Sequence, residues 1–258
     1  MKKYIIIVIT LIAFIVFSLL FYYKFDPSLL TRLSFYINLA NPSMRIVRVQ
    51  EGLRKEEVAK VVGDKLNWSD KEKEDFVNTG NIEGHYFPKT YLIYKDENPG
   101  GVVTTMLDEF STQISKVKKP KAKQIISEET ALKIASIIQR EAAGKEDMAL
   151  ISGIIWNRIF NGMKLQIDAT LQYAKGTEED GWWRQVTSAD KKIDSSYNTY
   201  LYAGLPPGPI ANPGIAAISA AYNPQKTNCM FYLHDKNRQI HCAATYEEHK
   251  KNIDTYLK

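Results

Sequence analysis

One glutamate lies on an apolar helix face, a position suited to proton transfer. In the predicted helix Glu128–Ala143, isoleucines recur at helical spacing over Ile134–Ile138, and Glu141 takes the next place on the same stripe. Burial favours the neutral form of a carboxyl group and raises its pKa, which is what a general acid needs near neutral pH. A structural glutamate paired with Arg158 or with backbone amides would show the same spacing. The pattern alone leaves both interpretations open.

A second carboxylate candidate lies in the segment Lys164–Tyr173. There Gln166, Asp168 and Thr170 alternate with apolar residues, a pattern that also fits a polar strand face or a turn. Many glycosidases use two carboxylates, and Asp168 would be the second if one were needed. No group of histidines, cysteines and carboxylates has metal-ligand spacing, so the sequence implies neither a metal nor a cofactor.

A loop rich in proline and glycine follows these candidates. Gly204–Gly214 holds four prolines and three glycines in eleven residues, which indicates a fixed, irregular loop that another chain can approach closely. Most loops of this composition are only connections. Asn212 and Pro213 then predict the start of a helix of small residues. Ser127 is a predicted N-cap for the helix of Glu141, with two acids in its first turn.

The first residues of the chain predict a membrane anchor. Tyr4–Tyr23 is uncharged over twenty residues, enough for a helix to cross about 30 Å of hydrocarbon. Lys2 and Lys3 favour a cytoplasmic N-terminus, which places residues 25–258 outside the cytoplasmic membrane, on its periplasmic side. A cleaved signal peptide is the alternative. Its apolar region would usually be shorter and would precede a small-x-small cleavage site, and none stands out.

The expected fold class is α+β, with a small unit between the anchor and the main domain. A strand at Arg45–Gln50 followed by helices at Arg54–Leu66 and Asp70–Asn78 resembles small glycan-binding LysM modules, although any small α+β unit can show this order. The basic segment Lys116–Lys123 reads as a linker. We therefore expect a single transmembrane helix over residues 1–24, a stalk and LysM-like unit over 25–118, and a mixed α/β catalytic domain over 119–258.

Composition excludes some classes of protein. The chain has 258 residues, of which 45% are hydrophobic and 24% charged, as in ordinary globular proteins rather than disordered ones. The net charge is +5, but the first 24 residues hold three lysines and no acid, so the remainder is nearly neutral. That balance gives no reason to propose a nucleic-acid partner.

Two cysteines flank a predicted hairpin. Cys229 and Cys242 stand at the outer ends of two short strand candidates around the turn Asp235–Arg238. An antiparallel hairpin can bring the two sulfur atoms together, and an oxidising compartment would allow a disulfide. Two buried, unpaired thiols are the alternative.

Six segments taken in order resemble the endolytic murein transglycosylase family, also called MltG or YceG-like. They are EGHYFPKTY, SIIQREA, IIWNRIFNGMKLQIDAT, YNTY, GLPPGPIANPG and TYEEH. Together with the anchor and the LysM-like unit, the resemblance covers almost the whole chain. The chain departs from the family pattern at Lys89 and Ala169, where aspartate and proline are usual.

The resemblance implies a substrate and a set of site residues. The substrate is the peptidoglycan glycan strand, cleaved at the MurNAc–GlcNAc β-1,4 bond to leave 1,6-anhydro-MurNAc ends during cell-wall assembly, with wall-synthesis enzymes as expected neighbours. The family's catalytic glutamate falls on Glu141. The residues that the resemblance assigns to lining or supporting the cleft are Asn157, Gln166, Asp168, Tyr197, Asn198, Thr199 and His249.

Convergence of these motifs predicts a groove. We expect Glu141 at its floor, with Tyr197–Tyr200 and the Gly204–Gly214 loop forming the opposite wall. Two other functions stay open at this point. One is a peptidoglycan hydrolase that uses water with Asp168 as second carboxylate, and the other is a non-catalytic wall-binding scaffold in which Glu141 is structural.

Overall fold

The structure is a computed structural model that describes residues 9–12, 14–16, 18, 40–80, 82–119 and 126–258. The predicted membrane segment Tyr4–Tyr23 lies largely outside these ranges. Among the described helices, none is both long and apolar enough to cross a bilayer. The described chain combines α-helices with two antiparallel two-stranded sheets, in agreement with the expected α+β class.

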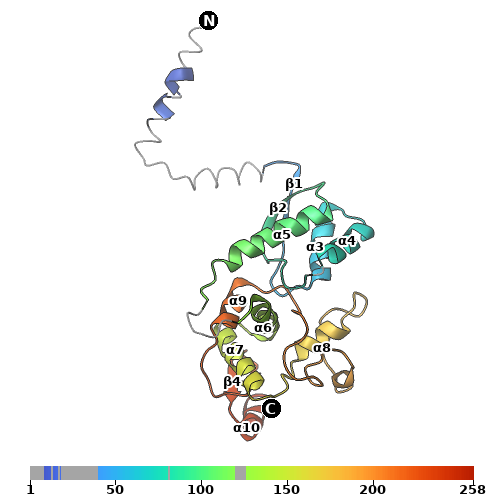
Figure 1. Cartoon of the computed structure of the whole chain (residues 1–258), viewed down its shortest axis with the longest axis vertical. Coiled ribbons are helices and arrows are strands. Elements are labelled where there is room, and N and C mark those ends of the chain that lie inside the picture. The colour runs from blue at the N-terminus through green and yellow to red at the C-terminus, as the bar shows by residue number, and fades with distance from the viewer. Residues whose placement is uncertain (1–8, 13, 17, 19–39, 81, 120–125) are drawn as a thin grey trace.

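An N-terminal unit is built around the first sheet (Figure 1). Its elements in order are β1 (Met44–Arg48), α3 (Lys55–Leu66), α4 (Asp70–Gly80), β2 (Thr90–Tyr94) and α5 (Pro99–Ile114). The strands pair antiparallel, from Met44 opposite Tyr94 to Arg48 opposite Thr90. The predicted strand–helix–helix order is confirmed, and the aromatic segment after α4 supplies the second strand. These elements enclose a core that includes Val47, Val58, Phe76, Tyr86 and Met106.

The second unit is mostly helical and has one helix at its centre (Figure 1). Its helices are α6 (Glu128–Glu141), α7 (Lys145–Phe160), α8 (Asp168–Lys175), α9 (Ile215–Tyr222) and α10 (Tyr246–Tyr256). Helix α6 packs against α7, α8 and α9. The Ser127 side chain accepts a hydrogen bond from the Thr130 amide, which confirms the predicted N-cap.

The apolar stripe of α6 explains its central place. Ile134, Ile137 and Ile138 are all fully buried in the core of this unit. Burying each such side chain stabilises the fold by about 1.5–3 kcal/mol. The helix ends at Glu141, two residues before the predicted end, and Ala142 leaves the helical conformation. The stripe therefore brings the glutamate to the edge of the core at the last turn.

The predicted C-terminal hairpin forms the second sheet. Strands β3 (Phe231–His234) and β4 (Ile240–Ala243) pair antiparallel, and α10 packs against both. Cys229 and Cys242 form a disulfide, with their Cα atoms 5.8 Å apart. Of the two alternatives for the cysteines, the disulfide is the one that the structure contains.

The two units share part of their packing. Phe87 follows α4, and Phe110 and Ile114 lie on α5, yet all three side chains belong to the hydrophobic core around α6. The N-terminal unit therefore packs directly on the second unit. The predicted domain boundary at residue 118 stays a prediction.

Candidate active site

A cleft of about 610 Å³ opens at the C-terminal end of α6. Its lining comes from α6, α7, α8, α10, the hairpin and the segments between α7 and α9, so that parts of the chain far apart in sequence meet there. The lining residues are Glu141, Arg158, Leu165, Gln166, Ile167, Asp168, Lys191, Tyr200, Phe231, Tyr232, Tyr246 and His249.

The surroundings of Glu141 favour its protonated form. Removal from water raises the pKa of this carboxyl above its usual value, and the negative charge of Asp168 raises it further. Its position at the negative end of the α6 dipole acts in the same direction. Hydrogen bonds from the Tyr232 hydroxyl and the Ala169 backbone amide oppose the rise in pKa. The side chain borders the cleft and is not sealed in the core.

Tyr232 is a direct hydrogen-bond partner of Glu141 that the sequence did not reveal. Its hydroxyl donates to Glu141 Oε2 at 2.6 Å. Burial raises the pKa of Tyr232 well above its usual value, and the nearby Glu141 charge adds to this, so the tyrosine remains a hydrogen-bond donor. Strand β3 carries this side chain, and the disulfide and β4 hold the strand. No local pattern in the sequence links this strand to α6.

Arg158 does not bond to Glu141, contrary to one of the interpretations considered above. Its Nε donates to the Met230 carbonyl at 2.6 Å, and another guanidinium nitrogen donates to the Leu165 carbonyl. The guanidinium thereby ties the segment before β3 to the segment before α8. Its positive charge lies on the wall of the cleft, 5.2 Å from the centre of the Phe231 ring.

Asp168 shares the cleft with Glu141 but has different surroundings. It is exposed at the first turn of α8, and its Oδ1 accepts a hydrogen bond from the Tyr200 hydroxyl at 2.6 Å. The segment before it was expected to be a strand face or a turn. In the structure the segment is irregular up to Ile167, the N-cap residue, and α8 begins at Asp168. Gln166 also lines the cleft, in a left-handed backbone conformation with φ of 51°.

His249 of α10 also lines the cleft. Its ring stacks on Phe231 with the ring centres 5.4 Å apart. Burial lowers the pKa of His249, and the positive charge of Arg158 lowers it further. The neutral imidazole with Phe231 and the half-exposed Tyr246 makes an aromatic wall. Of the eight residues predicted from the sequence, Glu141, Gln166, Asp168 and His249 thus meet in one cleft.

Asn198 and Thr199 lie behind the cleft, where they hold its backbone. Both are buried. The Thr199 hydroxyl accepts from the Ile167 amide at 3.0 Å and bonds to the Thr170 hydroxyl at 2.9 Å. The Asn198 side chain donates to the Ile193 carbonyl at 2.7 Å and accepts from the Tyr200 amide. These bonds fix Tyr200 and the start of α8, which both face the cleft.

Asn157 and Tyr197 lie outside the cleft. The Asn157 amide donates to the carbonyls of Thr227 and Cys229, so it fixes the chain that leads into β3. The Tyr197 ring packs on the Tyr173 ring of α8, with the ring centres 4.9 Å apart. Their contribution to the cleft is therefore indirect.

The expectation that the Gly204–Gly214 loop forms the opposite wall is wrong. The loop does not line the cleft. Its Ile210 amide instead donates to the Ser136 hydroxyl of α6, and its Asn212 bonds to the N-terminal unit. Strand β3 and helix α10 contribute to the lining in its place. The physical reason is that the buried Asn212 side chain finds its partners at the junction between the units.

A larger cavity, of about 710 Å³, lies on a different face of α7. Trp156, Phe160 and Tyr222 give it an aromatic lining, and Asn157 and Lys226 are among its polar residues. It contains no carboxylate, so it lacks a group suited to acid–base chemistry near neutral pH. The smaller cleft at Glu141 is the candidate active site.

Comparisons with known proteins point to one family. The YceG-like family model matches residues 22–255. A Bacillus subtilis (strain 168) protein named endolytic murein transglycosylase is 30% identical over an alignment of 237 positions, which covers 82% of this chain and 65% of that protein. A Streptococcus pneumoniae (strain D39) protein of the same name is 29% identical over 178 residues, which are 68% of this chain and 32% of that protein. The chain thus spans less than two thirds of each of these relatives.

A solved structure shows a similar fold. A crystal structure of a YceG-like protein from Listeria monocytogenes superimposes with a TM-score of 0.71 at 28% sequence identity. The match covers 82% of this chain and 76% of that one.

Proposed function

Because this chain belongs to the YceG-like family, we propose that it is an endolytic lytic transglycosylase that cleaves the MurNAc–GlcNAc β-1,4 bond of peptidoglycan glycan strands. One observation about Glu141 carries this proposal. Glu141 lies in a cleft, and removal from water favours its protonated form. The relatives named endolytic murein transglycosylase support the choice of substrate.

The first step is protonation of the leaving group. Protonated Glu141 donates its proton to the oxygen that bridges MurNAc and GlcNAc, and the bond from that oxygen to C1 of the muramyl residue breaks. A raised pKa keeps the proton available near neutral pH. The N-acetyl group of the substrate or nearby dipoles stabilise the positive charge that develops at C1.

The second step returns the proton to Glu141. The ionised carboxylate removes the proton from the muramyl C6 hydroxyl, and the C6 oxygen bonds to C1 to close the 1,6-anhydro ring. The Tyr232 hydroxyl, at 2.6 Å, and the Ala169 amide stabilise the carboxylate between the two steps. One carboxyl group therefore serves as acid and then as base, and the substrate supplies the nucleophile.

Asp168 supports a peptidoglycan hydrolase as the second candidate function. It lies in the same cleft and its charge affects Glu141, as a second carboxylate in a hydrolase would. A hydrolase and a lyase differ in their products. Hydrolysis leaves a reducing end that is heavier by one water than the 1,6-anhydro end.

The test is a digest of purified glycan strands by the unmodified protein and by Glu141→Gln. Glutamine keeps the size of the side chain but does not deliver and retrieve a proton, so we expect the rate to fall by about 10⁴-fold or more. Glu129→Gln makes the same change on an exposed turn of α6 and should leave the rate unchanged. Mass spectrometry should find 1,6-anhydro ends.

Each other outcome refutes a specific part of the proposal. Products with reducing ends would show that the protein is a hydrolase. An active Glu141→Gln variant would remove Glu141 from the mechanism. Strand binding without turnover by the unmodified protein would support a wall-binding scaffold.

The rest of the proposal concerns placement. The chain would be anchored in the cytoplasmic membrane by Tyr4–Tyr23, with its N-terminus in the cytoplasm and the cleft on the periplasmic side, where it would work beside wall-synthesis enzymes. The uncharged run supports the anchor, and the Cys229–Cys242 disulfide supports an oxidising compartment. The order β1, α3, α4, β2 with its antiparallel pair supports a LysM-like, glycan-binding role for the N-terminal unit.

A further inference from the structure

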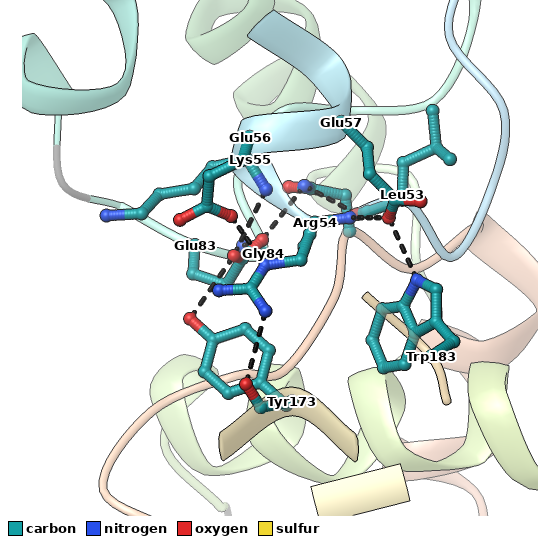
Figure 2. Close-up of polar contacts among 10 residues, drawn as sticks. Leu53, Arg54, Lys55, Glu56, Glu57, Glu83, Gly84, Tyr173 and Trp183 are labelled. Carbon is teal, nitrogen blue, oxygen red and sulfur yellow. Dashed lines mark hydrogen bonds and ion pairs between the residues drawn. The ribbon is translucent and has the colours of Figure 1, made fainter. Parts of the chain in front are cut away.

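A buried carboxylate that the mechanism does not use lies at the junction between the two units. Glu83 begins the segment EGHYFPKTY, and only 8% of its surface is exposed. It does not line the cleft. Four groups donate hydrogen bonds to its two oxygens, and Figure 2 labels Lys55, Gly84 and Tyr173 among them. The donors are the backbone amides of Lys55 and Gly84, the Tyr173 hydroxyl and the Asn212 side-chain amide.

One oxygen of this carboxylate leads to α8. Oε2 of Glu83 accepts from the Tyr173 hydroxyl at 3.3 Å, near the C-terminal end of that helix. The opposite end of α8 begins at Asp168 in the cleft, and the amide of Ala169 bonds to Glu141. Because α8 is only eight residues long, a displacement at one end moves the other.

Arg54 of the N-terminal unit holds the same end of α8 (Figure 2). A guanidinium nitrogen donates to the Tyr173 carbonyl at 3.1 Å, and the guanidinium lies 4.3 Å from the centre of the Tyr173 ring. The Trp182 ring is also 4.3 Å from this guanidinium. Glu56 pairs with the Arg54 Nε, which fixes the guanidinium from its own unit. Tyr173 is thus held by both its backbone and its hydroxyl.

The other oxygen of the carboxylate leads to α6. Oε1 accepts from Asn212, a fully buried residue of the Gly204–Gly214 loop, at 3.0 Å. On either side of it the loop binds α6, because the Ile210 amide donates to the Ser136 hydroxyl and the Gly214 amide to Gln139 Oε1, both at 3.0 Å. Helix α6 then ends at the residue that borders the cleft.

We propose that Glu83 is a positioning residue for glycan cleavage, because one of its oxygens bonds to Tyr173 of α8 and the other to Asn212 of the loop that binds α6, and the ends of these two helices meet in the cleft at Glu141. This inference rests on the proposed function. It assigns a role to the N-terminal unit beyond glycan binding, because Arg54 at the start of α3 and Glu83 after α4 fix the geometry of the active site.

The electrostatics of the junction fit this role. Burial is the main reason that the pKa of Glu83 is raised to about 7, and the negative charge of Glu56 acts in the same direction. The backbone amides of Lys55 and Gly84 and the positive charge of Arg54 oppose this rise. A buried carboxylate is retained only where donors compensate its loss of hydration. Removing one acceptor oxygen leaves buried donors unsatisfied, so the junction should loosen.

The test compares Glu83→Gln with the unmodified protein on the same glycan strands. The glutamine side chain offers one acceptor oxygen instead of two, so the donors at the other oxygen lose their partner. We expect kcat to fall by roughly 10- to 100-fold, as for a small displacement remote from the reacting atoms, with little change in KM. The pH–rate profile should also move, because the contact between Ala169 and Glu141 changes.

Two further variants make the test specific. Tyr173→Phe removes only the hydroxyl that bonds to the carboxylate. It should shift kcat and the pH–rate profile in the same direction as Glu83→Gln, but to a smaller extent. If Glu83→Gln does not fold, Tyr173→Phe alone tests the positioning role. Glu74→Gln makes the same chemical change on an exposed carboxyl of α4 and should leave kcat, KM and the pH profile unchanged.

Hydrogen exchange on the full chain gives a readout that does not depend on activity. Peptides covering residues 166–176 should exchange faster in Glu83→Gln and Tyr173→Phe than in the unmodified protein or Glu74→Gln. Unchanged exchange and unchanged kcat in both junction variants would overturn the positioning role. Absence of cleavage by the unmodified protein would instead refute the proposed function, whatever the exchange shows.

Discussion

The Tyr232→Phe substitution tests how the cleft controls the proton of Glu141. It removes one hydroxyl, which donates to Glu141 Oε2 at 2.6 Å, and keeps the ring in place on β3. The ring remains packed against the core around α6. The fold should therefore be preserved, and the change should be confined to the carboxyl group.

The size of the effect follows from the kind of hydrogen bond. A hydrogen bond to a charged group contributes about 1.5–3 kcal/mol. The proposed mechanism forms a carboxylate between its two steps, and the hydroxyl stabilises that form more than the neutral one. At about 1.36 kcal/mol per tenfold in rate, the loss corresponds to a fall in kcat of about 10- to 150-fold.

The pH dependence gives a second, directional result. The Tyr232 hydrogen bond lowers the pKa of Glu141, so its removal raises that pKa. The first step needs the protonated carboxyl, and the rate falls as the pH rises through its pKa. The alkaline limb of the profile should therefore move to higher pH in the variant.

The assay is the rate of glycan-strand cleavage across a pH series, with 1,6-anhydro ends quantified by mass spectrometry. Tyr222→Phe is the control, because it removes the hydroxyl of another buried tyrosine outside the cleft. An unchanged kcat in Tyr232→Phe, or an alkaline limb that moves to lower pH, would refute this account of Glu141.

Three other predictions test the junction, the hairpin and the topology. The pKa of Glu83 rises on folding from 4.5 to about 7, so its contribution to stability is fully present below about pH 4.5 and is lost as the pH rises through 7. Between these pH values the free energy of unfolding should fall by about 3 kcal/mol, which denaturant titration at several pH values measures. In Glu83→Gln the free energy of unfolding should depend less on pH. Replacing Cys229 and Cys242 by serine removes a cross-link with a sequence separation of 13 and should lower the free energy of unfolding by about 3 kcal/mol. Cleavage should also slow, since the hairpin carries Tyr232. Unchanged stability and activity in the double variant would contradict this prediction. A reporter fused after Lys258 should be active only when exported, and cytoplasmic activity would overturn the predicted orientation.

Local features of the fold were predictable because local interactions produce them. The spacing of isoleucines on α6 and the Ser127 cap depend on residues three or four positions apart, and both are present in the structure. The hairpin between Cys229 and Cys242 follows from two short strands around a polar turn, and it brought the two sulfur atoms into a disulfide.

The site was predictable only in part. Helical periodicity singled out Glu141, and the family resemblance added Gln166, Asp168 and His249, which line the same cleft. Asn157 and Tyr197 came from the same resemblance, yet they lie outside it. A motif identifies residues that matter to a family, but it does not distinguish a side chain facing the cleft from one that supports the backbone behind it.

The helix α6, the hairpin and the carboxyl group at the end of an apolar stripe were predictable because backbone geometry and side-chain periodicity act over a few residues. Helix α8 was not, since its polar alternation also fits a strand face or a turn. The groups that surround that carboxyl depend on long-range packing. Tyr232 is 91 residues from Glu141, and Asn212 is 129 residues from Glu83. Such pairs form because each buried polar group must find a partner once the core has closed, and its partner depends on how all the elements pack together.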